Sequence, residues 1–430
     1  MSYDSAFAEA HAARLLAELG SPGPVAGIGD HPALAWRRAG LMTLTGRPDG
    51  PGLVCPAALT SAADGALIAL RGLVDDPAAL PANGAVLLGE RARMMGLSRQ
   101  GAISPNGSCR LLECADGWIA LNMPRPDDWA MLPALLEDEV AEDWAGLAAA
   151  ARDRPAATMV ERGILLGLAV ALDEAPAASG SILTLPARTV ATRAGVPLVI
   201  ELASLWAGPL AGSLLAMAGA RVVKIESILR PDGARSGHAG FFDLINAGKE
   251  SVALDFDSAD GLAALAKLIA AADIVIEGSR PRALRQFGIN REAEIAGGAI
   301  WLAISGHGAQ APDRTGFGDD AGVAAGLSWL MEDAWGEPLF AGDAISDPLT
   351  GLYAALAGWT AWRAGEGRLI DLSLRAVLAH AIGAGVAGAG QLQHWQALAE
   401  ADDQPLYPLR PVPSVARALG ADTEAVFAQC

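Results

Sequence analysis

PLVIELASLWAGPLAGSLLAMAGARVVKIE, residues 197–226, alternates between strand-like and helical patterns of apolar residues. The pattern predicts a buried strand over 197–202, a helix over 207–220 and a second strand over 221–226. The alternation continues through strands predicted over 251–256, 273–278 and 299–305 and a helix predicted over 259–272. Short strands separated by helices of ten or more residues indicate βαβ units. We therefore expect an α/β fold built on a doubly wound, Rossmann-like, largely parallel sheet.

Sheets of this kind bind ligands at the carboxyl ends of their strands. The loops that follow these ends are predicted after Leu202, Glu226, Glu277 and Ser305. A ligand site is expected where these loops meet.

A carboxylate marks the next informative stretch, ISDPLTGLYAALAGWTAWRAGEGRLIDLSL, residues 345–374. Apolar side chains recur there at three- and four-residue steps, at Leu349, Leu352, Tyr353, Leu356, Trp359 and Trp362. They predict a helix to about Arg363, where Gly365 ends it before a strand. Asp347 precedes Pro348 and is expected to cap this helix, which is also the most common role of such a residue. A carboxylate at a helix N-terminus stays ionised and points outward, so a nucleophilic role is compatible with the cap.

A domain boundary is expected near residue 190, because the run 173–197 is rich in Pro, Ala, Ser and Thr. Upstream of it, CRLLECADGWIALNM, residues 109–123, predicts two strands around a turn at 115–117. Helical patterns follow over 126–150 and 156–166. Residues of about 104–178 are therefore expected to form a small α+β domain.

An internal echo links the two parts of the chain. The stretch from Arg37 aligns with the stretch from Gly322, and both contain AGL followed by an acidic turn. In this alignment Gly65 matches Gly351, and Ser61 occupies the position of Asp347. One copy therefore has the carboxylate and the other does not.

Composition restricts the class of protein. The 430 residues contain 49 Asp and Glu against 31 Lys and Arg, a formal net charge of −18, which argues against a nucleic-acid partner. No apolar run reaches the length of a membrane span, and the N-terminus lacks the basic segment of a leader peptide. The four cysteines form no disulfide or metal framework, and the six histidines show no ligand spacing. We expect a soluble, cytoplasmic protein that needs no metal and binds no membrane.

Four segments together resemble the class III CoA-transferase family. They are VIELASLWAGPLAGSLLAMAGARVVKIE, NAGKESVALDF, ADIVIEGSRPRALRQFGI, and SDPLTGLYAALAG followed by GRLIDLSL, all within about 196–382. CADGWIALN and the helices after it resemble the family's small domain, displaced toward the N-terminus. The chain is thus similar to a rearranged family member. Residues 1–190 then hold a partial copy without a nucleophile plus the small domain, and 191–430 hold the CoA-transferase domain with a C-terminal tail.

The resemblance implies that Asp347 is the nucleophile and that a coenzyme A thioester is a substrate rather than a permanently bound cofactor. The second substrate is a carboxylic acid acceptor. By the same resemblance the residues expected to line the CoA groove are Trp206, Ala207, Gly208, Arg230, Leu254, Gly278, Ser279, Arg280 and Arg282. The family often has basic residues where this chain has Ser227, Asp257 and Gln286, so nearby arginines such as Arg235 and Arg285 are expected to hold the CoA phosphates, although a solvated rim is an equally good interpretation. Family members form interlocked homodimers, so we expect a homodimer or, alternatively, a monomer in which the partial copy replaces the partner.

The sequence allows alternative roles for several charged residues and alternative activities for the protein. Asp319 is a candidate to assist the transfer, but a loop carboxylate that caps the following helix is the simpler interpretation. Lys224 and Glu226 are interpreted as a structural ion pair, and Lys249 as a turn anchor. The alternative activities are an acyl-CoA racemase, whose histidine would fall near Phe317 and Gly318, and a non-catalytic CoA-binding subunit.

Overall fold

The computed structural model describes residues 6–23, 25, 27, 29–138, 143–177, 188–189, 195–279 and 281–429. Its main sheet has the strand order β4-β10-β9-β8-β5-β6-β7. Six of these strands are parallel, and β4 pairs antiparallel with β10. The strands are β4 (Arg188–Thr189), β5 (Leu198–Leu202), β6 (Arg221–Ser227), β7 (Glu250–Leu254), β8 (Ile274–Glu277), β9 (Ile300–Ser305) and β10 (Glu366–Ser373). The predicted parallel, helix-flanked sheet is confirmed.

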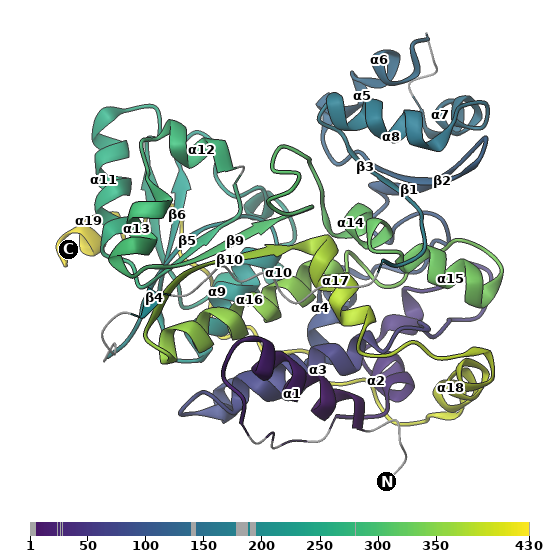
Figure 1. The fold of residues 1–430 in the computed structure, drawn as a ribbon, viewed down its shortest axis with the longest axis horizontal. Helices are drawn as coiled ribbons and strands as arrows, with labels where there is room; N and C mark the ends of the chain where they lie inside the picture. The colour runs from purple at the N-terminus through teal and green to yellow at the C-terminus, as the bar shows by residue number, and fades with distance from the viewer. Residues whose placement is uncertain are drawn as a thin grey trace.

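Helices cover both faces of this sheet. Successive residues of each strand point to opposite faces, so each strand contributes side chains to two separate cores. Val199 pairs with Val222 and Ile274, and these side chains join the core beneath α9 (Ala207–Met217) and α16 (Ser346–Arg363). Ile200, next along β5, joins a second core formed with α11 (Ala259–Ala270) and α19 (Thr423–Phe427). Figure 1 shows the sheet between these helices. The apolar runs of the strands are therefore explained by burial on two sides.

The small α+β unit has its own hydrophobic core and stands apart from the main sheet (Figure 1). The predicted hairpin is confirmed, since β1 (Cys109–Cys114) pairs antiparallel with β2 (Gly117–Asn122). A third strand, β3 (Ala169–Leu172), was not predicted. The helical pattern over 126–150 is divided into α5 (Pro126–Trp129), α6 (Leu132–Leu136) and α7 (Trp144–Ala151), and it is followed by α8 (Ala156–Leu165). Residues 139–142 and most of the expected connector lie outside the described residues.

The first hundred residues form helices that share one core with α9 and α16. These helices are α1 (Phe7–Glu18), α2 (Pro32–Arg38), α3 (Leu59–Arg71) and α4 (Ala85–Met95). Helix α3 packs against α16, and α4 also contacts α16 and α10 (Ala239–Asn246). The N-terminal segment is therefore part of the main body rather than a separate lobe.

Two helix pairs in this body are packed in the same way. A Cβ added to Gly65 of α3 would lie 2.6 Å from the carbonyl oxygen of Ala8 in α1. A Cβ added to Gly351 of α16 would lie 2.7 Å from the carbonyl oxygen of Ala207 in α9. Gly65 and Gly351 are the positions matched in the internal echo, so in both places a glycine permits the close approach of a helix.

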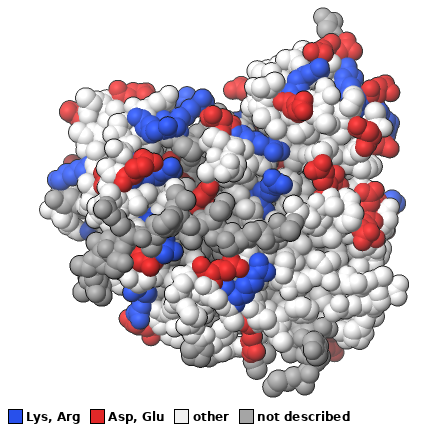
Figure 2. Space-filling view, viewed as in Figure 1, with Lys and Arg blue, Asp and Glu red and all other residues white. Residues whose placement is uncertain are grey.

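The remaining elements connect these layers. They are α12 (Pro281–Gln286), α13 (Arg291–Gly297), α14 (Gly318–Ala324), α15 (Leu327–Trp335), α17 (Leu374–Ile382) and α18 (Ala389–Ala401). The segment after α18 runs back to the sheet, where Ser251 donates its backbone N–H to Asp422. On the face in Figure 2, Lys and Arg side chains lie in small groups among Asp and Glu. Among the described residues, no helix is both long and apolar enough to cross a membrane.

Candidate active site

A cavity of about 380 Å³ opens at the N-terminal end of α16, between the N-terminal and C-terminal halves of the chain. The N-terminal half contributes Arg91 and Met95 from α4 and Asn106, Ser108, Asn122 and Pro124 from around the small unit. The C-terminal half contributes Leu205, Trp206, Gly233, Ala234, Gly237, His238, Phe241, Phe317, Gly318, Asp319, Ala344 and Asp347. The cavity thus joins residues that are more than 250 positions apart in sequence.

Asp347 lines this cavity, but it does not cap α16 as the sequence predicted. The helix begins at Ser346, two residues before the predicted first helical residue Pro348, so Asp347 lies in its first turn. The backbone N–H of Asp347 donates to the carbonyl of Ala344 at 2.9 Å. Among the described residues, no group forms a hydrogen bond with the Asp347 carboxylate. The side chain is therefore left free for a ligand.

Gly318 lies directly against that carboxylate. A Cβ added at position 318 would overlap Oδ2 of Asp347 and lie 2.6 Å from the carbonyl oxygen of Ala344. The absence of a side chain at Gly318 is what leaves room for the Asp347 carboxylate in the cavity.

Asp319 and Asp320 have separate roles. The capping carboxylate of α14 is Asp320, whose Oδ1 accepts from the backbone N–H of Phe317 at 2.9 Å. The capping interpretation of Asp319 is therefore wrong. Asp319 lines the cavity and accepts from Asn106 Nδ2 at 3.0 Å and from the Ala344 backbone N–H at 2.9 Å. It fixes the loop that carries Asp347.

Unusual backbone conformations occur at this cavity. Three described residues other than glycine have positive φ, and two of them, Leu205 (φ 70°) and Ala344 (φ 43°), line the cavity. Such conformations cost on the order of 1–3 kcal/mol and persist where the surroundings impose them, which is common at functional sites. Here the Asp319 carboxylate holds Ala344 in place.

A buried ionic network imposes the conformation at Leu205. The carboxylate of Asp232 accepts from the Leu205 backbone N–H at 3.0 Å and pairs with Lys224 at 2.9 Å. Lys224 also pairs with Glu201, which in turn pairs with Lys249 at 2.7 Å. The predicted pair of Lys224 with Glu226 is wrong, because Glu226 pairs with Arg235 instead. Lys249 bonds to the Pro209 carbonyl of α9 at 2.7 Å, so it anchors a helix as well as its own turn.

The cavity holds more negative than positive groups. The pKa of Asp347 is raised to about 7: burial is the largest cause, Arg91 opposes it, and nearby Asp319, Asp343 and Asp320 add to it. Burial likewise raises the pKa of Asp343 to about 6 and that of Asp320 to about 7. Asp347 therefore changes charge near neutral pH.

The residues predicted to line a CoA groove are distributed unevenly around the cavity. Trp206 lies in it, with its ring at right angles to that of Phe241 at 5.4 Å between centroids. Ala207 and Gly208 are buried in helix packing and do not line it. Gly278 and Ser279 follow β8, and Leu254 is the buried last residue of β7. All three positions lie at the carboxyl ends of parallel strands, and Gly278 packs against Ala203, which precedes the cavity residues Leu205 and Trp206.

The predicted basic residues do not enter the cavity. Arg230 is exposed after β6, and Arg282 makes a 3.9 Å ion pair with Asp313. Arg235 is held by Glu226 and stacks on Phe242 at 4.7 Å, so it is occupied by protein contacts. Arg280 lies outside the described residues.

The sequence did not identify the contribution of the N-terminal half. Arg91, Asn106 and Ser108 stand in segments with no motif of their own, and Asn122 ends the stretch CADGWIALN, which the sequence did not connect with the site. Only the fold brings α4 and the small unit to the end of α16.

The segment that contains Asp319 and Asp347 also matches a family of known proteins. Residues 195–408 match the sequence model of CoA-transferase family III. This segment belongs to CoA-transferase family III. It contains β5 to β10, Asp319 and Asp347.

Several curated relatives of this segment are named as CoA-transferases. The chain is 33% identical over 201 residues to succinate–glutarate CoA-transferase of Agrobacterium fabrum, covering 41% of this chain and 49% of that protein. It is 29% identical over 191 residues to human succinyl-CoA:glutarate CoA-transferase, covering 41% and 44%. The chain spans about half the length of the curated relatives it matches. A crystal structure of a CAIB/BAIF family protein from Brucella suis aligns at 27% identity with a TM-score of 0.39, over 52% of this chain and 62% of that one.

Proposed function

We propose that this family III protein transfers coenzyme A from an acyl-CoA thioester to a carboxylic acid, with Asp347 as the nucleophile. The observation that carries the proposal is the Asp347 carboxylate, which has no hydrogen-bond partner among the described residues and faces a 380 Å³ cavity in the family segment. A nucleophile needs an accessible, unpaired oxygen in a site from which bulk water is largely excluded.

The chemistry proceeds by exchange at the Asp347 carbonyl carbon. An ionised oxygen of Asp347 attacks the thioester carbonyl, the C–S bond breaks, and CoA thiolate leaves a mixed anhydride. The thiolate attacks the Asp347 carbonyl carbon and expels the first acid, which forms an aspartyl-CoA thioester. The acceptor carboxylate then displaces the thiolate to form a second anhydride, and the thiolate attacks its acyl carbon to release the new acyl-CoA.

Asp319 acts on this reaction through the backbone. Its hydrogen bonds to Ala344 and Asn106 fix the turn that presents Asp347. The CoA moiety extends from the cavity past Trp206 toward the carboxyl ends of the strands, where Gly278 and Ser279 lie. Arg230 and Arg282 would bind the CoA phosphates, because their side chains are largely exposed.

The names of the relatives suggest the first substrates to try. Succinyl-CoA as donor with glutarate and malate as acceptors are the combinations those names contain. Their use by this chain is a proposal.

The racemase alternative is disfavoured by the site. It requires an acid–base group near Phe317 and Gly318, and a side chain at 318 would occupy the position of the Asp347 carboxylate. The non-catalytic CoA-binding subunit is distinguished from the transferase only by activity.

A cytoplasmic location and a homodimer remain predictions. The matched packing of α1 on α3 and of α9 on α16 supports the alternative, a monomer in which the N-terminal copy takes the place of a partner. In that copy Ser61 is buried and replaces the carboxylate. Light scattering of the purified chain separates a monomer from a dimer.

Transfer is tested with a panel of acyl-CoA donors and acids, with product CoA thioesters separated by chromatography. The proposal predicts a new thioester whose formation depends on the acid, without exchange of α-protons in deuterated water. Exchange without transfer would indicate the racemase, and binding of CoA without either reaction would indicate the binding subunit.

The rate of transfer is expected to depend on the ionisation of Asp347. Because the pKa of this carboxyl is raised to about 7, kcat/KM for the acyl-CoA should rise about tenfold per pH unit below 7 and level off above it. A pH–rate profile between pH 5 and 9 checks this. A profile that is flat from pH 5 upward would show that Asp347 is already ionised at low pH or is not the nucleophile.

A further inference from the structure

One positive charge lies among the carboxylates of the cavity, and it comes from the N-terminal half. Asp319 and Asp347 line the cavity, and Asp343 adjoins it. Arg91 of α4 is the only Lys or Arg among the described residues that line it. The carboxylates of residues 195–408 at this site therefore have their positive charge supplied by α4, which lies outside that segment.

Two contacts fix the guanidinium of Arg91. Its Nη1 donates to Oδ2 of Asp343 at 2.9 Å, and the Asp343 side chain is fully buried. The guanidinium also lies over the ring of Trp206, 5.0 Å from the centroid. No described group accepts from Nε or Nη2. The group is thus oriented on two sides while part of its edge remains available to the cavity.

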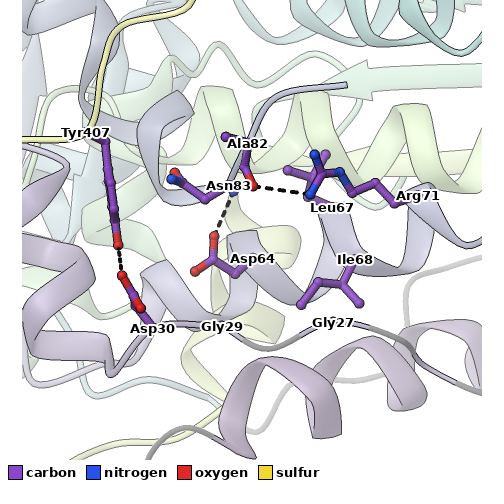
Figure 3. A pocket seen from close by; sticks show the side chains of 11 residues that line it. Gly27, Gly29, Asp30, Asp64, Leu67, Ile68, Arg71, Ala82, Asn83 and Tyr407 are labelled. Carbon is purple, nitrogen blue, oxygen red and sulfur yellow. Dashed lines mark hydrogen bonds between the residues drawn. The ribbon is translucent and has the colours of Figure 1, made fainter. Parts of the chain in front are cut away.

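Helix α4 is itself anchored at its N-terminus. The Asp64 carboxylate of α3 accepts from the backbone N–H groups of Gly84 and Ala85, at 2.7 and 3.0 Å. Figure 3 shows this carboxylate at the wall of a second cavity, directed toward the start of α4. A buried ion pair joins Glu90, the neighbour of Arg91, to Arg410. The position of Arg91 is therefore set by the fold.

We propose that Arg91 is a positioning residue for the transfer reaction, which places a fixed positive charge beside the carboxylate cluster and so keeps Asp347 an oriented anion. This inference rests on the proposed role of Asp347. It assigns to the N-terminal half a function in the chemistry, beyond closing the cavity.

The surrounding charges show why such a cation is needed. The groups that bear on Asp347 are Arg91 from α4, Asp319 and Asp320 from α14, and Asp343 from the preceding loop. His238 lies at the start of α10 on the cavity wall, where its Nδ1 accepts from the Phe241 backbone N–H. Burial and three carboxylates favour the neutral acid, and Arg91 alone among these groups opposes them. Loss of Arg91 should therefore raise the pKa of Asp347 further.

The test compares Arg91→Met, Arg91→Lys and the control Arg93→Met. Arg93 is two residues along α4 and donates to the Tyr407 carbonyl at 2.7 Å, so its removal takes a cation from the same helix without changing the cavity. Titration of Asp carboxyl carbons by NMR, with the Asp347 signal assigned from its absence in Asp347→Asn, gives the midpoint directly. In Arg91→Met the midpoint is expected to rise by about one pH unit or more, whereas Arg91→Lys and Arg93→Met should stay near the native value.

The pH–rate profile provides the second readout. The acidic limb of Arg91→Met should move upward with the NMR midpoint, so that the loss of rate is about fivefold or more at pH 7 and much smaller at pH 9. An unchanged midpoint in Arg91→Met, with the fold intact by circular dichroism, would overturn the inference. If wild type transfers no CoA at all, the proposed function fails, and the NMR midpoint still decides the effect of Arg91 on Asp347.

Discussion

Asp347→Asn is expected to lower the rate of CoA transfer by at least about 10³-fold, because an amide oxygen cannot form the anhydride on which both halves of the reaction depend. Binding of CoA should persist, since the change is nearly isosteric. The measurement is the steady-state rate of thioester exchange, together with the dissociation constant for CoA.

The control is Asp333→Asn, which removes an exposed carboxylate on α15 away from the cavity.

The effect of Asp347→Asn on stability can be measured separately from its effect on the reaction. Because the pKa of Asp347 is raised to about 7 in the folded protein, ionisation disfavours folding as the pH rises from about 4 to 7. The variant should therefore be at least as stable as wild type, and its advantage should be largest above pH 7. An Asp347→Asn protein that transfers CoA at a rate close to wild type would exclude this residue as the nucleophile.

Gly318→Ala is expected to be the second most damaging small change. The added methyl group would overlap Oδ2 of Asp347 and press on the carbonyl oxygen of Ala344, so the carboxylate or its turn must move. A displacement of about 1 Å can cost on the order of 10²-fold in rate. We expect such a loss in kcat/KM, with an overpacking cost of about 1–3 kcal/mol in the free energy of unfolding.

Gly322→Ala is the matched control, one turn further along α14. A Cβ at position 322 would meet its nearest neighbour, Oγ of Ser346, at an ordinary 3.6 Å. Alanine is also the better helix former by about 1 kcal/mol, so this variant should be active and at least as stable as wild type. Equal activity of the two alanine variants would show that the Asp347 carboxylate is not confined by Gly318.

The sheet could be predicted because its signal is local. The strands of the parallel sheet are four to eight residues long and contain short apolar runs, and burial on both faces of the sheet requires such runs. The hairpin of β1 and β2 was predictable for a similar reason, because alternation and a turn at Asp116 and Gly117 define it. Strand β3 was missed since Ala169–Leu172 is short and follows directly on a helical segment.

The interpretation of Asp347 as a cap failed because it depended on the exact residue at which α16 begins. Ser346 and Asp347 are both good residues near a helix start, and only the fold selects the earlier one. For the same reason the sequence assigned the capping role at the start of α14 to Asp319, whereas Asp320 fills it. In both cases the misassigned carboxylate is the one that faces the cavity.

The contribution of Arg91 could not be predicted from the sequence. Its partners, Asp343 and Trp206, are more than 100 residues away, and no periodicity connects them. The buried network of Lys224, Glu201 and Asp232 was misassigned for the same reason, since charges pair across strands and loops rather than along them.

Intact-protein mass spectrometry after incubation with an acyl-CoA tests the central claim most directly. The account predicts a CoA-sized or acyl adduct on the wild-type chain that hydroxylamine removes and that peptide mapping places on Asp347. It predicts no adduct on Asp347→Asn. A transferase-active wild type that never carries an adduct, or an adduct that persists in Asp347→Asn, would contradict covalent catalysis by Asp347.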